Sequence, residues 1–548
     1  MKGHLLQPAT TIFRGGTVLT MDDGDSEAEA VAVADGRILA VGSETDVLQR
    51  SGEQTKKIDL GGKTMIPAFI DPHGHFPESG FCALHRVDLM CPPLGDVTRL
   101  DQVYERLADH VAKAPRGAWV FGTFFDQTVV DEKRFPTAAE LDRVSKDHAV
   151  VVMHMCGHAC VGNSEALRRA GVDRSTPQPQ GGHIEKDPIT GEPTGLLEEP
   201  AAMGPISAAM FSSTGERFRE GLRWAADEYA SQGVTSAQNA WSNGPLLAEF
   251  LSAARDGEPK IRMTVLPDAH LEPDIAAGRL KLDVPDPRHL KIGPRKLFSD
   301  GSIQVFTAYM SKPYHTAFRG DADYRGYPVY ERDALTKHIT KLHEAGHQIH
   351  IHVNGDGAGD DVLHAFEIAQ DRHPRTDHRH TIIHGQTLRD DQLDKIRTLG
   401  LSVSFFNFHV YVWGDRHRDF FLGPERAERI SPMASAGERG IRYTMHNDTP
   451  VTPMRPLPLI WSAVNRLTSS GHVLGPAQRI TPTQALRAHT IDAAWQVFRE
   501  DDLGSIEAGK SADFAVLSKN PLQNTGTIND IQVETTIKDG EVIFGSID

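Results

Sequence analysis

His73 and His75 are the first residues of the chain whose types and spacing could do chemistry. They follow the apolar run 65–70 in the segment DPHGH (71–75). Side chains two residues apart on a strand point to the same face, so both imidazoles can bind one cation. The pair is weak evidence alone, because a histidine at a strand end is often a packed, hydrogen-bonded residue.

Four further residues able to bind metal or transfer protons stand within or just after other β-prone runs: Lys296, His352, His384 and Asp448. Parallel strands of a barrel end at one common rim, and active sites are built there. We therefore predict that all six side chains meet at one rim. With 27 histidines against four cysteines, the chain must build a metal site from imidazole and carboxylate groups.

The elements that must position these residues form a strand-and-helix alternation. Helical patterns at 332–345 and 392–399 separate some of the expected strands. Eight strands with crossover helices favour a (β/α)₈ TIM barrel, an α/β fold, although the count leaves a doubly wound sheet open. The stretch of about 77–232 is too long for one crossover helix and predicts an insertion after strand 1. The eight expected strands are 65–70, 234–237, 261–266, 296–298, 350–353, 381–384, 401–405 and 442–445.

Both ends of the chain carry a hairpin pattern. Asp35-Gly36 and Asp539-Gly540 each separate two β-prone runs, and Asp-Gly supplies the positive φ of a type I′ turn. The pattern leaves two possibilities open: one sheet that takes strands from both termini, or two unrelated hairpins.

Composition excludes several classes of protein. The net charge of −16, without basic runs, argues against nucleic acid or an anionic membrane surface as the main partner. Four cysteines cannot form a disulfide scaffold and fit a reducing cytoplasm. No stretch approaches the roughly 18 apolar residues of a membrane helix, and the first residues lack a signal-peptide core. We expect a soluble, cytoplasmic protein.

Eight segments in the same order make the chain resemble the amidohydrolase superfamily, in the branch of amidohydrolase family 3 similar to N-substituted formamide deformylase. The resemblance covers nearly the whole chain. It implies a composite β-sandwich of both termini (1–64 and 481–548) beside a metal-dependent hydrolase barrel (65–480). The segments are PAFIDPHGH (67–75), GHACVGNSEAL (157–167), PTGLLEE (193–199), RKLFSDGS (295–302), IHVNGDGA (351–358), IIHGQ (382–386), NDTPVTP (447–453) and LGSIEAGKSADFAVL (503–517).

The same resemblance implies two divalent metal ions. Zinc suits the donor set best, and Mn²⁺, Co²⁺ and Fe²⁺ are compatible with it. Lys296 would take up CO₂ as a carbamate and bridge the ions; the alternative is an ordinary salt-bridged lysine and a single metal. The implied ligands are His73, His75 and Asp448 at the first ion and His352 and His384 at the second.

The implied reaction is hydrolysis of a non-peptide C–N bond in a small N-acyl or N-formyl compound. A hydroxide bridging the metals would attack the carbonyl, and Asp448 would pass the proton to the leaving nitrogen. The resemblance also implies a homodimer. One alternative is a mononuclear deaminase of the same superfamily. Such enzymes carry a glutamate at the position of Gly355, so this residue counts against the alternative. Another is a non-catalytic barrel scaffold, against which all six ligand positions are filled.

Other residues are weaker candidates. His158 and Glu199 match family positions on the insertion and are predicted substrate contacts. Phe406 and Trp413 follow the seventh strand and either line a hydrophobic substrate pocket or pack loop against barrel. For His446 we favour packing over a hydrogen bond to substrate.

The run 154–160 places His, Cys, His and Cys two residues apart. These types could form a zinc knuckle, but an extended strand would spread them too far to meet at one ion. We therefore expect its thiols, Cys156 and Cys160, to be core residues.

Overall fold

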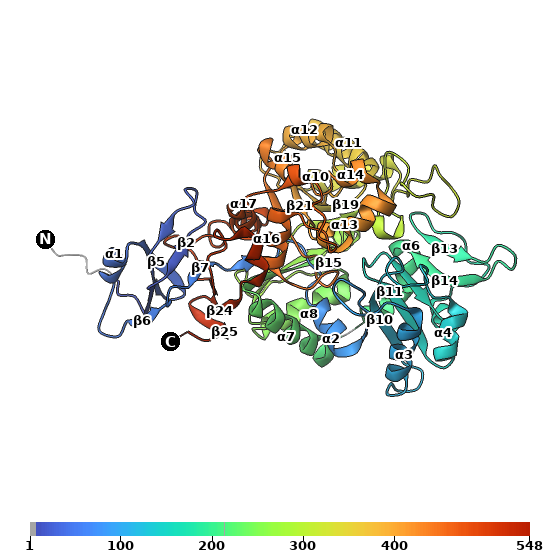
Figure 1. Ribbon diagram of the computed structural model, residues 1–548, viewed down its shortest axis with the longest axis horizontal. Coiled ribbons are helices and arrows are strands. Elements are labelled where there is room, and N and C mark those ends of the chain that lie inside the picture. The colour runs from blue at the N-terminus through green and yellow to red at the C-terminus, as the bar shows by residue number, and fades with distance from the viewer. Residues whose placement is uncertain (1–6, 213, 548) are drawn as a thin grey trace.

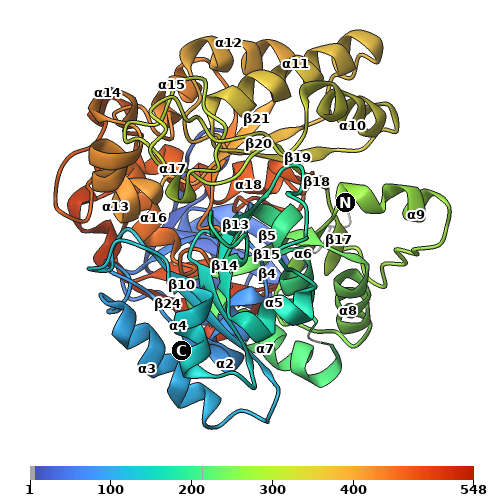
Figure 2. The ribbon, with the colours of Figure 1, turned by 90° about the vertical axis from the view of Figure 1, so that its right-hand side faces the viewer.

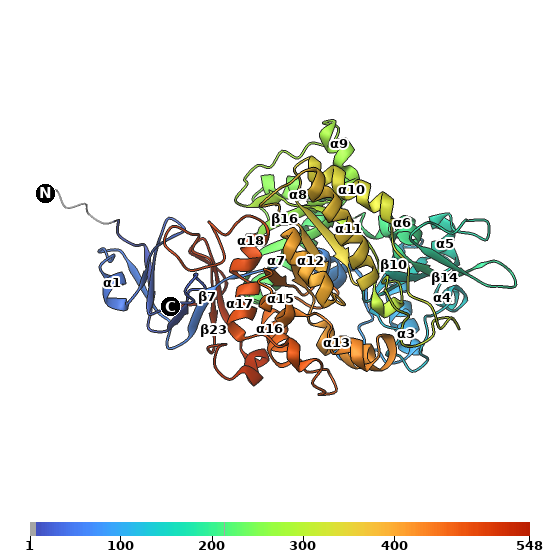
Figure 3. The ribbon, with the colours of Figure 1, turned by 90° about the horizontal axis from the view of Figure 1, so that it is seen from above.

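The computed structural model describes residues 7–212 and 214–547, which form a mixed α/β fold. Strands of both termini lie at one end of the molecule, parallel sheets with their helices lie in the middle, and β10 to β14 lie at the other end (Figures 1 and 3). None of the helices described is long and apolar enough to span a membrane.

Two parallel sheets form the middle of the molecule. An isolated parallel bridge between Asp268 and Lys296 connects them. β-Branched residues alternate with histidine in β19, and all five residues of the strand are buried. The first sheet contains β8 (Phe69–Ile70), β15 (Val234–Ser242), β16 (Arg262–Pro267) and β17 (Leu290–Ile292). The second contains β18 (Arg295–Phe298), β19 (Ile349–Val353), β20 (Thr381–His384), β21 (Ser402–Phe405) and β22 (Tyr443–Met445).

The predicted barrel is not closed in the strand pairing of the described residues. β8 pairs with β15 on one edge, whereas the N–H groups of Ala68 and Ile70 donate to the carbonyls of Asp513 and His489 on the other. β22 therefore has no edge of β8 to join. The structure also adds a parallel strand, β17, that the sequence pattern did not indicate.

The expected first strand, 65–70, is two strands in different sheets. β7 (Thr64–Pro67) pairs with β2 and β23 among the terminal strands, and β8 begins two residues later. Pro67 lacks a backbone donor and ends β7, which lets the chain cross from one sheet to the next.

Helices cover the outer faces of the parallel sheets. Figure 2 shows α7, α8, α10, α11 and α12 around the periphery. A representative case, α12, ends where Gly400 takes a φ of 67° as a left-handed cap. The helices after the insertion are α8 (Gly244–Arg255), α9 (Glu272–Ala276), α10 (Arg332–Glu344), α11 (Asp356–Arg372), α12 (Asp390–Leu399), α13 (His409–Arg416), α14 (Pro424–Ala427), α15 (Met433–Glu438), α16 (Pro456–Asn465), α17 (Pro482–Ala488) and α18 (Ile491–Gln496).

Between β8 and β15 the chain forms a six-stranded sheet with its own helices. Successive residues of β11 enter two different hydrophobic clusters, Val150 and Val152 in one and Val151 and Met153 in the other. Both faces of this sheet are therefore buried. Its order is β13 (His183–Lys186), β14 (Pro193–Glu198), β12 (Ala159–Gly162), β11 (Ala149–His154), β10 (Trp119–Phe125) and β9 (Val87–Asp88). The helices beside it are α3 (Leu100–Val111), α4 (Ala138–Val144), α5 (Ser164–Ala170) and α6 (Glu199–Met210); α2 (Glu78–His85) and α7 (Gly215–Ser231) pack against each other and enter the hydrophobic cluster of the parallel sheets.

The two ends of the chain contribute to one sheet, which excludes two unrelated hairpins. It runs β25 (Glu541–Gly545), β24 (Val533–Lys538), β23 (Phe514–Leu517), β7, β2 (Thr17–Leu19) and β3 (Glu27–Ala28). A second sheet runs β5 (Arg37–Gly42), β4 (Ala30–Ala34), β1 (Thr11–Arg14) and β6 (Lys56–Asp59), with α1 (Glu44–Leu48) beside it. Phe13 and Phe514 pack in one cluster shared by both sheets. The limits 1–64, 65–480 and 481–548, and a β-sandwich, stay predictions.

We predict that Arg262 couples the parallel sheets to the C-terminal segment. It lies on β16 with 5% of its side chain exposed and pairs with Asp513 (6% exposed) and Asp539. Arg262→Met leaves the buried Asp513 carboxylate without its ion-pair partner, with only the backbone N–H of Asp539 still donating to it, and we expect a loss of about 3–5 kcal/mol in the free energy of unfolding. Denaturant unfolding measures it. Arg279→Met, which breaks an exposed pair with Asp274, should cost less than about 1 kcal/mol; equal losses in both variants would contradict the assignment.

Candidate active site

A cavity of about 840 Å³ lies where the parallel strands end, and all six residues predicted as metal ligands line it. Lys296, His352 and His384 reach it from β18, β19 and β20 of the second parallel sheet, and the others reach it from the segments after β8 and β22. The sequence-based expectation that these side chains meet is therefore met in the geometry. The six are His73, His75, Lys296, His352, His384 and Asp448.

His73, His75 and Asp448 form a compact group. Asp448 Oδ1 lies 3.6 Å from His73 Nε2 and 3.4 Å from His75 Nε2, and the three donor atoms lie within 4.8 Å of one another. Asp448 takes a φ of 53°, a left-handed conformation that aspartate tolerates better than most residues. Burial raises the pKa of Asp448, but the close contact with His75 and its charge outweigh burial and hold the pKa well below its usual range.

The donor atoms of this group have the properties expected of cation ligands. Both ring nitrogens of His73, which is 1% exposed, and Oδ1 of Asp448 have no hydrogen-bond partner among the residues that the structure describes. An unsatisfied buried polar group costs about 1–3 kcal/mol. Burial, and then the charge of Lys296, lower the pKa of His73 well below its usual value, which keeps the ring neutral. Neutral imidazoles and a carboxylate at this spacing fit a divalent cation.

His352 and His384 lie on neighbouring strands with ring centroids 4.6 Å apart. Asp300 Oδ1 lies 3.1 Å from His352 Nδ1. A carboxylate behind one ring nitrogen fixes the orientation of the ring, and Asn354 Nδ2 lies 3.3 Å from the other ring nitrogen, Nε2.

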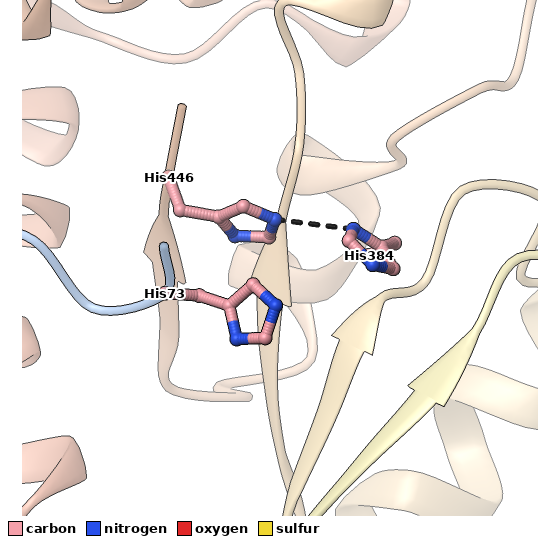
Figure 4. Close-up of side chains that lie close together, drawn as sticks. All are labelled: His73, His384 and His446. Atoms are coloured by element: carbon pink, nitrogen blue, oxygen red, sulfur yellow. Dashed lines mark hydrogen bonds between the residues drawn. The ribbon is translucent and has the colours of Figure 1, made fainter. Parts of the chain in front are cut away.

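His446 joins the site, although we favoured a packing role from sequence. Its Nε2 lies 3.1 Å from His384 Nδ1, and with His73 and His384 it forms a second set of donors within 4.8 Å (Figure 4). Ser404 Oγ lies 2.8 Å from its Nδ1. The sequence signal was present: His446 and Asp448 are two residues apart, as His73 and His75 are.

His350 is a second histidine that the sequence reasoning missed. It precedes His352 by two residues on β19, it is fully buried, and both of its ring nitrogens lack partners. Burial and the charge of Lys296 lower its pKa well below the usual value. His350 does not line the cavity, so it lies deeper than the candidate ligands.

Lys296 lines the cavity and is deeply buried, with 1% of its surface exposed. Burial lowers its pKa to about 7, against the carboxylate of Asp448, which raises it. Its Nζ lies 4.8 Å from the ring centroid of Phe298, and within the described chain it forms no ion pair. A salt-bridged lysine, the alternative interpretation, is therefore not what the structure has.

His158 and Glu199 form a pair at the cavity wall. His158 Nδ1 lies 2.8 Å from Glu199 Oε2, and the His158 ring lies 5.0 Å from that of His352. Burial lowers the pKa of His158, but the Glu199 carboxylate outweighs it and raises the pKa to about 9. Of these two residues, His158 lines the cavity and Glu199 lies behind it. A side chain at Gly301 would come within 2.0 Å of Glu199 Oε1, so this glycine gives Glu199 its place.

Phe406 and Trp413 do not line the cavity, so the pocket role predicted for them is wrong and the packing alternative is right. They are 1% and 0% exposed. Trp413 Nε1 donates to Asp126 in the insertion, and Phe406 packs against His409 and His446. The apolar wall comes instead from residues that include Phe81, Phe124, Met155, Met203, Phe211, Trp241, Phe298 and Tyr330.

The profile of the amidohydrolase family matches residues 56–544, nearly the whole chain. The chain belongs to the amidohydrolase family. N-substituted formamide deformylase of Arthrobacter pascens is 30% identical over 95% of this chain and 96% of its own length. Protein LONG AFTER FAR-RED 3 of Arabidopsis thaliana is 29% identical over 93% and 88%. A solved structure of an uncharacterized metal-dependent hydrolase from Pyrococcus furiosus is 26% identical with a TM-score of 0.71, over 94% of this chain and all of that one.

Membership of the amidohydrolase family confirms the resemblance found in the sequence. It also confirms a hydrolase that acts on carbon–nitrogen bonds other than peptide bonds. The possible His/Asp metal site agrees with the metal dependence named for the Pyrococcus relative.

Proposed function

We propose that this amidohydrolase cleaves the amide-like C–N bond of a small, hydrophobic N-acyl or N-formyl compound with the help of two divalent metal ions. One observation carries the proposal: a single cavity holds buried, unpartnered nitrogen and oxygen donors together with a wall of aromatic and aliphatic side chains. The donors fit metal ions, and the wall fits an apolar substituent.

Zinc is the cation we propose, because two or more imidazoles with carboxylate oxygens are its common ligands. One ion would be held by His73, His75 and Asp448 and the other by His352 and His384. Lys296 would lie between them as a carbamate. Bound ions of this kind lower the pKa of water and polarise a carbonyl.

The chain's own residues supply the proton transfers and the orientation. The Asp448 carboxylate, held ionised beside two imidazoles, accepts the proton of the attacking water and returns it to the leaving nitrogen. His158, fixed by Glu199, contacts the substrate from its place beside His352. The apolar side chains exclude water from the substituent and hold it in register with these groups.

The apolar wall supports a hydrophobic substituent on the nitrogen. Trp241, Phe211 and Phe124 line the same cavity as the candidate ligands. Trp241 Nε1 donates to Asp268 Oδ2 at 2.7 Å, which fixes the indole and presents its ring as a rigid surface. The Arthrobacter relative is named for N-substituted formamides, and these combine a small acyl group with such a substituent.

The deaminase alternative has less support. Gly355 replaces the glutamate that it needs, and the neighbouring Asp356 is already occupied by hydrogen bonds from Ser311 and an ion pair with Arg389. Asp356 does not line the cavity. The scaffold alternative is opposed by the six candidate ligands that line it.

We predict close to two metal ions per chain and the highest kcat/KM for formamides or amides with an aromatic or alkyl N-substituent. Elemental analysis gives the metal content, and a panel of N-formyl, N-acyl, carbamate, lactone and ureido compounds gives the specificity. Trp241→Ala should lower kcat/KM for an N-benzyl substrate at least tenfold, because burial of a large aromatic ring is worth more than about 1.5 kcal/mol. Trp224→Ala, which removes an exposed indole on α7, should leave it within twofold.

Three results would count against this function. Turnover by a chain without metal removes the metal-dependent hydrolase, and a preference for polar ureido compounds removes the hydrophobic substrate class. One metal per chain with ammonia as product restores the deaminase.

A further inference from the structure

Cys156 lines the active-site cavity, contrary to the sequence-based expectation of a core thiol. It lies in the turn after β11 and is partly exposed, whereas Cys82, Cys91 and Cys160 are buried. Cys156 Sγ lies 2.9 Å from His154 Nδ1. The thiol therefore faces the cavity with an imidazole directly behind it.

The contacts of His154 orient its ring as a base for this thiol. Nδ1 also accepts the backbone N–H of Cys156 at 3.1 Å, which places the lone pair, and not a proton, at Nδ1. Nε2 is buried, has no hydrogen-bond partner, and lies 3.9 Å from Asp126 Oδ1. The Asp126 carboxylate is itself fixed at 3.0 Å by Trp413 Nε1 and at 2.9 Å by Arg416 Nη1. Thiol, imidazole and carboxylate thus follow the order of nucleophile, base and orienting acid.

We propose that Cys156 is a modification site, whose thiolate reacts with soft electrophiles that enter the cavity. Hydroperoxides are the class of natural electrophile that it would meet. The assignment does not depend on the proposed hydrolytic function, because it rests on the arrangement of Cys156, His154 and Asp126 and on their place at the cavity wall.

The charges around the thiol agree with this assignment. Burial raises the pKa of Cys156, but the charge and hydrogen bond of His154, and the charge of His158, outweigh it and lower the pKa. Burial lowers the pKa of His154, and the Cys156 and Asp126 side chains raise it to about 9.

The other three cysteines provide the contrast within the same chain. Burial raises the pKa of Cys82, Cys91 and Cys160 to about 12 in each case. Cys82 also lines the cavity, so access alone does not distinguish it from Cys156. The difference is the imidazole, since the thiolate and not the thiol is the nucleophile.

The reaction with a hydroperoxide balances with the groups present. The thiolate sulfur attacks the distal, hydrogen-bearing oxygen, an S–O bond forms, and the O–O bond breaks. The leaving alkoxide takes a proton from the His154 imidazolium and departs as the alcohol. The sulfur is oxidised by two electrons to a sulfenic acid and the peroxide is reduced by two. Two external thiols restore the cysteine: the first forms a mixed disulfide with loss of water, and the second displaces the cysteine and leaves as the external disulfide.

Modification would change the cavity next to the candidate metal ligands. Cys156 lies two residues before His158, whose ring packs against that of His352. A group added to Cys156 Sγ therefore occupies the wall of the space in which the substrate lies, and we infer that oxidation closes the active site.

Labelling of the metal-loaded full chain with iodoacetamide tests the proposal without a substrate. At pH 6.5 we expect one equivalent of label per chain, on Cys156 by peptide mass, with a rate at least tenfold above that of Cys82. Cys82→Ser should label as the wild type does, and Cys156→Ser should not label in the same time. Faster labelling of any other cysteine overturns the proposal.

The role of His154 is tested by the pH profile. In the wild-type chain the Cys156 rate should change less than threefold between pH 6.5 and 8.5, whereas an ordinary thiol gains about tenfold per pH unit below its pKa. His154→Asn should restore that steep dependence and slow labelling at pH 6.5 at least tenfold. A steep profile in the wild-type chain contradicts the thiolate even if the variant does not fold.

Hydrogen peroxide followed by dimedone, which traps sulfenic acids, tests the oxidation itself. We expect one dimedone adduct on Cys156, prevented by dithiothreitol added before the trap, and none in Cys156→Ser. If iodoacetamide labels Cys156 and dimedone does not, the natural electrophile class that we propose is wrong.

Discussion

Asp448→Asn is expected to lower kcat about 10²- to 10⁴-fold, the range typical of a lost general acid–base group. The carboxylate is the only acceptor of its group that can gain a proton from water and return it, and its amide replacement cannot. Asparagine is the informative substitution because it keeps the size of the side chain and tolerates the left-handed conformation of residue 448. An amide oxygen can still bind a cation, so the metal content of Asp448→Asn should stay close to that of the wild type.

Asp492→Asn is the matched control. Its carboxylate is 16% exposed and pairs with Arg442 at 3.0 Å, next to the opposite end of β22, outside the cavity. It should keep kcat within about threefold of the wild type. Kinetics on the best substrate of the panel, with metal content and thermal unfolding of each variant, make the comparison. A kcat of Asp448→Asn within tenfold of the wild type removes the residue from proton transfer.

The strand-end residues could be predicted because their position depends on local rules. The common polarity of parallel strands brings His352 and His384 to one rim, and His73 and His75 follow the end of β8 at the same cavity. The same rules applied to residues 350 and 446 would have found both remaining histidines. His446 packs against the rings of His73 and Phe406, in agreement with the packing role expected from sequence, and its additional contact with His384 is one that the sequence did not indicate.

The cavity wall could not be predicted, because it is made by tertiary packing of distant segments. Phe406 and Trp413 follow a strand that ends at the rim, yet the Trp413 indole turns away to Asp126, a residue 287 positions earlier. Phe124, Phe211 and Trp241 come from the insertion and the strand after it. No local period indicates which aromatic residues of an insertion will face a site formed by another part of the chain.

The fold shows the same division between local and distant information. Asp-Gly turns predicted both terminal hairpins, since the turn chemistry lies within the hairpin itself. The run 65–70 has the composition of one buried strand, but Thr64–Pro67 pairs with β23, more than 400 residues away, and Phe69–Ile70 pairs with β15. The backbone N–H groups of Ala68 and Ile70 donate to the carbonyls of residues 513 and 489, and these bonds occupy the edge of β8 that a closed barrel would use. Both partners lie more than 400 residues away, so no local pattern indicates them.

Lys296→Ala is expected to lower the metal content from about two ions per chain to about one and to abolish most of the turnover. A charged ammonium at 1% exposure without an ion pair is costly. A carbamate on Nζ removes that ammonium and adds anionic oxygens beside the candidate imidazole ligands that line the same cavity. Alanine leaves the imidazoles in place but withdraws those oxygens, so the second ion should be the one lost.

Lys291→Ala separates the carbamate from the burial of a lysine. Lys291 lies on β17, burial lowers its pKa to about 8, and it lies outside the cavity. Because Lys291 lies away from the candidate metal ligands, no metal ion would stabilise a carbamate on it. Its replacement should therefore change neither the metal content nor kcat. NMR of the protein equilibrated with isotopically labelled bicarbonate should show one carbamate resonance in the wild type and in Lys291→Ala, and none in Lys296→Ala.

Chemical rescue decides between a lost ligand and a disturbed fold. Lys296→Ala opens space at the position of the proposed carbamate, and acetate or propionate can supply two carboxylate oxygens there. We expect short carboxylates to restore the second metal ion and part of kcat in Lys296→Ala, with no effect on the wild type. A Lys296→Ala chain that keeps two metal ions and full turnover without any carboxylate contradicts the bridging role, because then neither ion needs an oxygen from this position.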